Sequence, residues 1–188
     1  MNQRVDIALL NECAKGLPDA QKQLIELQFV PFMTLCKRYA KSNAQANELF
    51  QAGFLEIFQY VADFKDKTDP DSWLYECFLK SVIRQLKNNR AEYFITTTIR
   101  HDEKKTENTS AQHPPANIND FDTEIYFSAL QQLPPAFRAI FNLSVIDNFP
   151  ISKVSEILEI SEYSAANTLD RAKNEFIRTL LSQKFAHA

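Results

Sequence analysis

Glycine is nearly missing from this chain of 188 residues, in which it occurs only twice. Tight β-hairpins and phosphate-cradling loops both depend on glycine, because glycine adopts positive φ angles without steric cost. Neither a dinucleotide-binding fingerprint nor a P-loop is present in the sequence. The scarcity argues against a β-rich fold and against nucleotide-binding loops. We therefore predict an all-α fold.

Cysteine and long apolar runs are also scarce. Cys13, Cys36 and Cys77 lie far apart among apolar helix positions, which is typical of reduced core cysteines in a cytosolic protein. The N-terminus has no apolar signal core, and no run approaches the length of a membrane span. We therefore expect a cytoplasmic protein that does not insert into a membrane.

Residue groups that could carry catalysis do not stand out either. The sequence shows no nucleophile–base pair, and its histidines have no carboxylate or cysteine at metal-ligand spacing; they are His101, His113 and His187. We expect no enzyme, no metal site and no cofactor.

Positive charge is concentrated in one stretch. The formal net charge of −3 argues weakly against a generic nucleic-acid binder. From Lys80 to Lys105, however, basic residues outnumber acidic ones, whereas the preceding segment leans acidic. Such a local stripe suits a protein that holds DNA with one surface and a basic protein partner with another.

Apolar residues at spacings of three and four predict a first helical domain over residues 1–95, with helices over 7–15, 18–42, 43–63 and 73–90. Asp6 is expected to cap the first helix, and Gly16 to end it. Pro31 is expected to break or kink the second helix, and Asp71 or Ser72 to cap the fourth.

The fourth helix carries the basic residues of this domain on one side. Lys80, Arg84 and Lys87 recur at spacings of four and three and therefore share a face. Because exposed lysines are common, charge alone favours a solvated helix surface as much as a nucleic-acid contact.

A polar segment and a second domain follow. Residues 96–120 contain too few apolar residues to offset the entropy of ordering, so they are predicted to form a flexible linker. In the second domain, 121–188, helical patterns over Ser152–Leu158 and Glu162–Leu180 meet at a connection of three residues. This spacing fits a helix-turn-helix, in which Ser152 and Ser161 would cap the two helices.

The order and spacing of short motifs in both domains resemble those of RNA polymerase sigma factors of the extracytoplasmic-function (ECF) type, in the sigma-70 family. In the first domain the resemblance rests on Arg38-Tyr39-Ala40, Glu48-Leu49-Phe50-Gln51, Phe54 and Trp73-Leu74. In the second domain it rests on Leu133-Pro134, Phe137-Arg138, Ile160-Ser161-Glu162 and Arg171-Ala172-Lys173. The resemblance extends over nearly everything except the linker.

The resemblance implies a transcription initiation factor without catalysis of its own. Such a protein binds core RNA polymerase, directs it to promoter DNA and assists promoter melting, and the family also allows an anti-sigma factor as a partner. The first domain would bind core polymerase and the minus-ten promoter element. The second, the helix-turn-helix domain, would bind the minus-thirty-five element.

The family positions also imply site residues. Core polymerase binding falls on Glu48, Gln51 and Phe54. Minus-ten DNA binding falls on Trp73, Lys80, Arg84, Lys87 and Arg90. Minus-thirty-five DNA binding falls on Tyr163, Ser164, Asn167, Thr168, Arg171 and Lys173. For Trp73 a core position is at least as good an interpretation, and Phe54 also fits the apolar face of its helix.

This chain departs from the family pattern on two helices. Gln45, Asn47 and Ala52 stand where the family usually has further acids, so polymerase binding is expected to be weaker or to depend on apolar contacts. Ala166 and Thr168 stand where the family is often basic. Fewer cations lower non-specific DNA affinity, so we expect an upstream reader that is weak alone and depends on tethering to polymerase. The alternative is a sigma-like adaptor or regulator that has lost promoter recognition.

Overall fold

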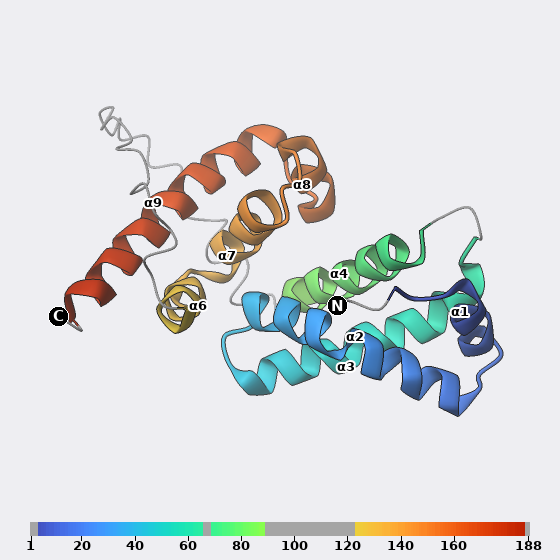
Figure 1. Cartoon of the computed structure of the whole chain (residues 1–188). Coiled ribbons are helices and arrows are strands. Elements are labelled where there is room, and N and C mark those ends of the chain that lie inside the picture. Colours follow the sequence, from blue (N-terminus) through green and yellow to red (C-terminus); the bar gives the residue numbers. More distant parts are fainter. Residues whose placement is uncertain (1–3, 66–68, 89–122, 187–188) are drawn as a thin grey trace. The chain divides into compact units, whose positions relative to one another are not determined.

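The computed structural model of the chain describes residues 4–65, 69–88 and 123–186 (Figure 1). Within these residues the secondary structure is helical and contains no strand, which confirms the all-α prediction. The chain divides after Asn88 into two compact units. The predicted linker, 96–120, lies outside the described residues. No helix in the described part of the chain has the length and apolar character needed to cross a membrane.

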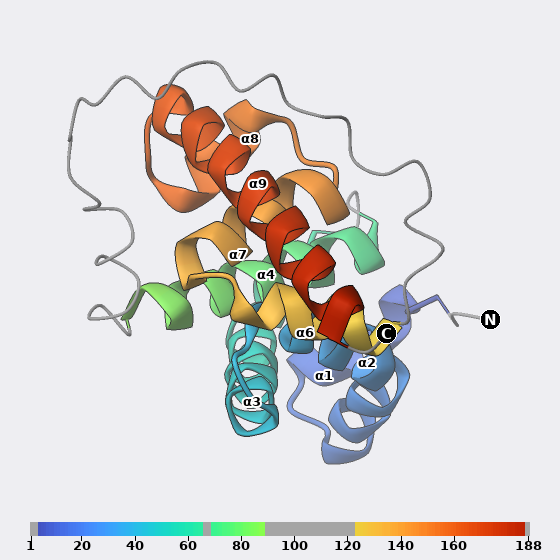
Figure 2. The same ribbon diagram turned by 90° about the vertical axis from the view of Figure 1, so that its left-hand side faces the viewer.

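The first unit contains α1 (Ile7–Ala14), α2 (Pro18–Tyr39), α3 (Asn43–Tyr60), a 3₁₀ turn (Val61–Asp63) and α4 (Pro70–Asn88). Helix α3 packs against both α2 and α4, and α1 packs against α2 and the 3₁₀ turn (Figure 2). The core between these helices is aromatic. The ring centroids of Phe32 and Phe78 lie 4.1 Å apart, and those of Phe50 and Phe54 lie 4.9 Å apart.

The ends of α1 follow from local sequence. The Asp6 carboxylate accepts a hydrogen bond from the Ala8 amide at 3.3 Å and caps the helix, as predicted. Gly16 has a φ of 74° and ends the helix, also as predicted. Its amide donates to the Cys13 carbonyl at 2.9 Å, while the next amide reaches the Glu12 carbonyl at 3.4 Å. This pair of bonds is a Schellman motif, which favours glycine at its left-handed position.

Helix α2 continues through Pro31, so of the predicted break or kink the break does not occur. Proline removes one backbone hydrogen bond and crowds the preceding turn. Leu24 before the proline and Phe32 and Leu35 after it are nevertheless buried, so tertiary packing holds the helix together on both sides of the proline.

Helix α4 begins three residues earlier than expected, and neither predicted cap holds its N-terminus. The Asp69 carboxylate accepts hydrogen bonds from the Ser72 amide at 2.9 Å and the Ser72 hydroxyl at 2.8 Å. These bonds favour the charged carboxylate and lower the pKa of Asp69 below its ordinary value. Asp71 instead accepts a hydrogen bond from the Val5 amide at 3.3 Å, which ties the N-terminal segment to α4.

The second unit contains α6 (Thr123–Gln132), α7 (Pro135–Phe141), a π-helical turn (Asn142–Ile146), α8 (Ile151–Leu158) and α9 (Glu162–Ala186). Helix α9 packs against α6, α7 and α8. Its buried stripe is Ala165, Leu169, Ala172, Phe176 and Leu180. Helix α7 passes directly into the π turn at Asn142.

A buried arginine fixes the corner between α6 and α7. Arg138 is only 2% exposed. Its guanidinium donates to the carbonyls of Leu130 at 3.1 Å, Gln131 at 2.6 Å and Leu133 at 2.9 Å. The last carbonyls of a helix lack partners within the helix and carry partial negative charge. Arg138 satisfies those at the end of α6 and compensates them with a cation.

Helices α8 and α9 form the predicted helix-turn-helix. The Ser161 hydroxyl accepts a hydrogen bond from the Ser164 amide at 3.1 Å and caps α9, as predicted. Ser152 lies inside α8, whose preceding residue Pro150 makes no side-chain cap, so that predicted cap is wrong. Between the helices Glu159 adopts a φ of 57°, a left-handed conformation that makes the tight turn.

Gly53 sets the distance between α3 and α4. A Cβ atom at this position would overlap the aromatic ring of Phe78, whose side chain is fully buried. The two helices can therefore approach this closely only because residue 53 lacks a side chain.

We expect Gly53→Ala to lower the free energy of unfolding of the first unit by about 1–3 kcal/mol, because the added methyl group overpacks a filled core. At an exposed helix position the same change would stabilise by roughly 0.5–1 kcal/mol, so the sign of the effect tests the contact. Urea denaturation can be followed through the fluorescence of Trp73, the only tryptophan. Gln59→Ala, on the exposed side of α3, is the control and should shift stability by no more than about 0.5 kcal/mol. A more stable Gly53→Ala variant would contradict the close approach.

Candidate nucleic-acid interface

The outward side of α4 carries the predicted basic face. Lys80 and Arg84 are exposed and Lys87 is partly exposed, whereas Leu79, Val82 and Ile83 on the other side are buried. The prediction that the three cations share one side of the helix is therefore confirmed. Arg90, the fourth predicted cation, lies outside the described residues. The contact of this face with DNA stays a prediction.

Arg84 is bound to an acid of the neighbouring helix. Its guanidinium makes two hydrogen bonds to Glu56 of α3, at 2.9 Å from Nη1 and 2.5 Å from Nη2. The Glu56 side chain is only 12% exposed, against 53% for Arg84. Parallel hydrogen bonds of this kind are the strongest arginine–carboxylate geometry. Arg84 is predicted from the sequence as a DNA contact, and Glu56 is not among the predicted site residues.

A signal for Glu56 was present in the sequence. Glu56 follows Leu49 and Gly53 at spacings of seven and three, so it belongs to the side of α3 that packs against α4. A carboxylate on a packed face needs a partner, because burial penalises an unpaired charge. Which cation supplies it could not be read from spacing, since Arg84 lies 28 residues further along the chain.

Cys77 lies beside this ion pair on α4 and is partly exposed. Burial, and then the negative charge of Glu56, raise the pKa of the Cys77 thiol to about 11. Lys80 and Arg84 oppose this shift because cations favour the thiolate. The thiol is therefore protonated at neutral pH, and its pKa responds to the charges around it.

Trp73 stands at the start of α4 and is partly buried. Its ring meets Phe64 edge-on, with centroids 5.5 Å apart and planes at 70°. This contact joins the first turn of the helix to the segment before it. It gives Trp73 a structural role, as the alternative interpretation of this residue expects. A DNA contact by its exposed part remains a prediction.

The outer stripe of α3 differs from the predicted set of polymerase contacts. Glu48 and Gln51 are exposed, whereas Phe54 is only 4% exposed. Its ring lies against Phe32 and Phe78 in the core, at centroid distances of 5.9 and 5.8 Å. A direct polymerase contact through Phe54 conflicts with this burial, and the interpretation as a core residue is correct.

Leu55, rather than Phe54, lies exposed beside Glu48 and Gln51. It is 71% exposed and follows Glu48 and Gln51 at spacings of seven and four, so the three side chains form one stripe. The spacing alone could have shown that Leu55 shares a helix face with the polar residues Glu48 and Gln51.

The residues predicted to bind the minus-thirty-five element do not all lie on one face of α9. Tyr163 is 78% exposed, and Asn167 and Arg171 are exposed at successive spacings of four on the same side. The Arg171 guanidinium lies 5.4 Å from the centre of the Phe137 ring, a cation–π contact that orients it. Lys173 is exposed, but a separation of two residues turns it away from Arg171, so the two cations cannot serve one face.

Ser164 and Thr168, the other two predicted residues of α9, have less side-chain surface available for a DNA contact. The Ser164 hydroxyl accepts a hydrogen bond from Ser161 at 2.9 Å, within the cap of the helix. Thr168 is partly buried. Their contacts with DNA remain predictions.

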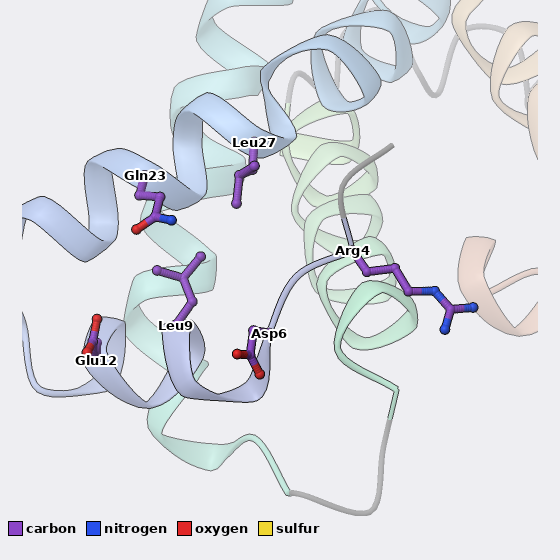
Figure 3. A pocket seen from close by; sticks show the side chains of 6 residues that line it. All are labelled: Arg4, Asp6, Leu9, Glu12, Gln23 and Leu27. Carbon is purple, nitrogen blue, oxygen red and sulfur yellow. The ribbon is translucent and has the colours of Figure 1, made fainter. Parts of the chain in front are cut away.

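A groove of about 350 Å³ lies between α1 and α2 (Figure 3). Leu9 and Leu27 approach each other across it, Gln23 and Glu12 stand at its edge, and Arg4 points away. The groove contains none of the predicted site residues. The described residues also contain no cluster of His, Cys, Asp or Glu that could hold a metal ion, and all three histidines lie outside them.

Two protein-family models match the chain, one in each predicted domain. Sigma-70 region 2 matches residues 30–92, and Sigma-70, region 4 matches residues 124–175, together more than half of the sequence. The chain is also similar to the ECF RNA polymerase sigma factor SigW of Bacillus subtilis (strain 168). The two are 19% identical over 176 residues, which cover 91% of this chain and 94% of SigW. The chain belongs to the ECF sigma factors of the sigma-70 family.

The fold of this sigma factor is similar to that of a solved relative. The sigma factor RpoE of Bartonella quintana, in complex with the anti-sigma factor NepR, superposes with a TM-score of 0.53 at 16% identity. The match covers 85% of this chain and 95% of that one. As a sigma factor the protein acts in transcription initiation, and its two domains bind core RNA polymerase and promoter DNA. The family consists of transcription factors rather than enzymes.

Cys77 offers a chemical test of the Glu56–Arg84 pair. We expect Glu56→Gln to accelerate alkylation of Cys77 by iodoacetamide at mildly alkaline pH, because removing the neighbouring anion lowers the pKa of the thiol. The rate can be measured by mass spectrometry of the peptide that contains Cys77. Cys36 is fully buried, with a pKa raised to about 12 mainly by burial, and serves as internal control with an unchanged rate. Equal Cys77 rates in both proteins would contradict the placement of Glu56.

Proposed function

We propose that this sigma factor holds core polymerase through the outer stripe of α3 and reads promoter DNA with α4 and α9. The first domain would bind the minus-ten element, and the helix-turn-helix domain the minus-thirty-five element. The observation that carries this assignment is the separation of faces on region 2. An aromatic core buries one side of each helix, and the polar stripe of α3 and basic face of α4 are left exposed.

The stripe of Glu48, Gln51 and Leu55 suits a protein partner better than a nucleic acid. Its single charge is negative, which repels phosphate and attracts a basic protein surface. Leu55 supplies apolar area that a partner can desolvate, and such central residues carry most of the energy of a protein interface. This agrees with the expectation that polymerase binding depends on apolar contacts where family acids are missing.

Promoter contact by α4 would depend mainly on electrostatics. Lys80 and Lys87 on its outer side can neutralise phosphates, which supplies affinity without sequence preference. Trp73 can add stacking with an unpaired base only through the part of its ring that Phe64 leaves exposed.

The helix-turn-helix would read bases with few side chains. Asn167 can bond adenine at two atoms, and Tyr163 next to it can contact a thymine methyl group or the backbone. Arg171 supplies one phosphate contact on this face, while Lys173 points elsewhere. We therefore propose a weak reader that gains its effective concentration from the tether to polymerase.

We place this activity in the cytoplasm, where core polymerase and the chromosome of a bacterium are found. We also propose an anti-sigma factor as a regulatory partner. Support comes from the structurally similar RpoE of Bartonella quintana, which was solved in complex with one.

A sigma-like adaptor without promoter recognition is the second candidate. It is favoured by Ala166 and Thr168 on α9 and by the neutralised Arg84 on α4, all of which reduce attraction to DNA. The two functions share polymerase binding and differ in whether transcription starts at defined sites.

Reconstitution with core polymerase tests the proposal. We expect the purified full chain to direct transcripts from defined start sites on a library of genomic fragments, read by sequencing of RNA 5′ ends. Core polymerase alone on the same library is the control. Binding to core polymerase without new start sites would favour the adaptor, and absence of binding would contradict both functions.

The α3 stripe can be tested separately. We expect Leu55→Ala to weaken binding to core polymerase by about tenfold, equivalent to about 1.4 kcal/mol, as measured by competition for labelled enzyme. Val30→Ala on α2 is a matched control, because Val30 and Leu55 are both 71% exposed. Equal losses in the two variants would show that general surface apolarity, rather than this stripe, determines binding.

A further inference from the structure

The Glu56–Arg84 pair changes the electrostatics of the α4 basic face. An arginine bound at both Nη atoms to a carboxylate carries its charge next to an equal and opposite one. Affinity for DNA phosphates depends on the counterions that a cation displaces, so a neutral pair displaces few. A phosphate that approached Arg84 would also approach the carboxylate of Glu56.

The position of Glu56 favours a stable ion pair with Arg84. Glu56 lies on the side of α3 that packs against α4 and is 12% exposed, so water screens it poorly. Its helix is held against α4 by the close contact of Gly53 with Phe78, one turn earlier. Arg84, in contrast, is 53% exposed, so its outer N–H groups face solvent although its charge is compensated.

Lys80 on the same face has no such compensation. It lies one turn before Arg84, is exposed, and makes no ion pair within the described part of the chain. On this face, therefore, the charge of Arg84 is compensated, whereas that of Lys80 on the preceding turn is not. Nothing in the spacing of α4 itself distinguishes them.

We propose that Glu56 sets the DNA affinity of this surface by withholding Arg84 from phosphates. Lys80 then supplies sequence-independent attraction, and Arg84 contributes only where an arriving DNA strand displaces the Glu56 carboxylate. Glu56 is thus a specificity-determining residue, since it reduces binding to arbitrary DNA. This inference rests on the proposed function of α4 as a DNA-binding helix.

A double-mutant cycle on the full chain tests the inference. The variants are Glu56→Gln, Arg84→Ala and the combination of both, and fluorescence anisotropy reports binding to a fluorescein-labelled single-stranded oligonucleotide of mixed sequence over a series of salt concentrations. We expect Glu56→Gln to tighten binding severalfold at low salt and to steepen the log–log salt dependence by about 0.7, the contribution of one phosphate contact to a single strand.

The decisive quantity is the coupling between the two positions. When Glu56 is present, Arg84→Ala should leave the salt dependence nearly unchanged because Arg84 contacts no phosphate, although the carboxylate that it uncovers lowers the affinity. In the Glu56→Gln background it should remove the gain of about 0.7 in slope. An equal effect of Arg84→Ala in both backgrounds would overturn the inference, as would unchanged binding by Glu56→Gln.

Two controls separate this inference from the proposed function. Glu12→Gln removes one negative charge, as Glu56→Gln does, but from the exposed surface of α1. It should affect binding much less than Glu56→Gln. Lys80→Ala should weaken binding and flatten the salt dependence. If Lys80→Ala has its effect while Glu56 and Arg84 show no coupling, only this inference fails. If Lys80→Ala and Arg84→Ala both leave binding unchanged in every background, the assignment of α4 to DNA fails as well.

Discussion

The close approach of α3 and α4 at Gly53 is the constraint on which the first domain depends. Without a Cβ atom at this position the Phe78 ring lies directly against the helix backbone, and the aromatic core closes around it. The same approach brings Glu56, one turn later on α3, within hydrogen-bonding distance of Arg84. One packing contact therefore affects both the stability of the domain and the charge on the outer side of α4.

In the second domain a buried cation fixes how two helices meet. Arg138 binds the terminal carbonyls of α6 and so fixes the corner from which α7 leads into the helix-turn-helix. Helix α9 packs its apolar stripe on this frame, which leaves Tyr163, Asn167 and Arg171 outward. The few exposed polar groups on this face explain why a reader of this kind would depend on tethering.

Charge and apolar area are divided between the functional faces. The α3 stripe offers Leu55 with an acid and an amide, which fits a protein partner, whereas the α4 face offers cations whose total charge is reduced by Glu56. A sigma factor acts as part of a polymerase complex, so weak attraction to DNA by each surface alone is compatible with firm promoter binding by the whole. We expect weak attraction of this kind also to limit occupation of DNA outside promoters.

The sequence by itself determined the features that depend on local periodicity. Scarce glycine and helical spacings predicted an all-α chain, the basic side of α4 and the helix-turn-helix with its Ser161 cap, because spacings of three and four decide which residues share a helix side. Family motifs then predicted the two sigma-factor regions.

Only the tertiary structure decided what each side touches. It buried Phe54 and exposed Leu55, kept α2 helical through Pro31, and paired Arg84 with an acid 28 residues earlier. Such outcomes depend on the packing of one helix against another, and periodicity within a single helix contains no information about the neighbour.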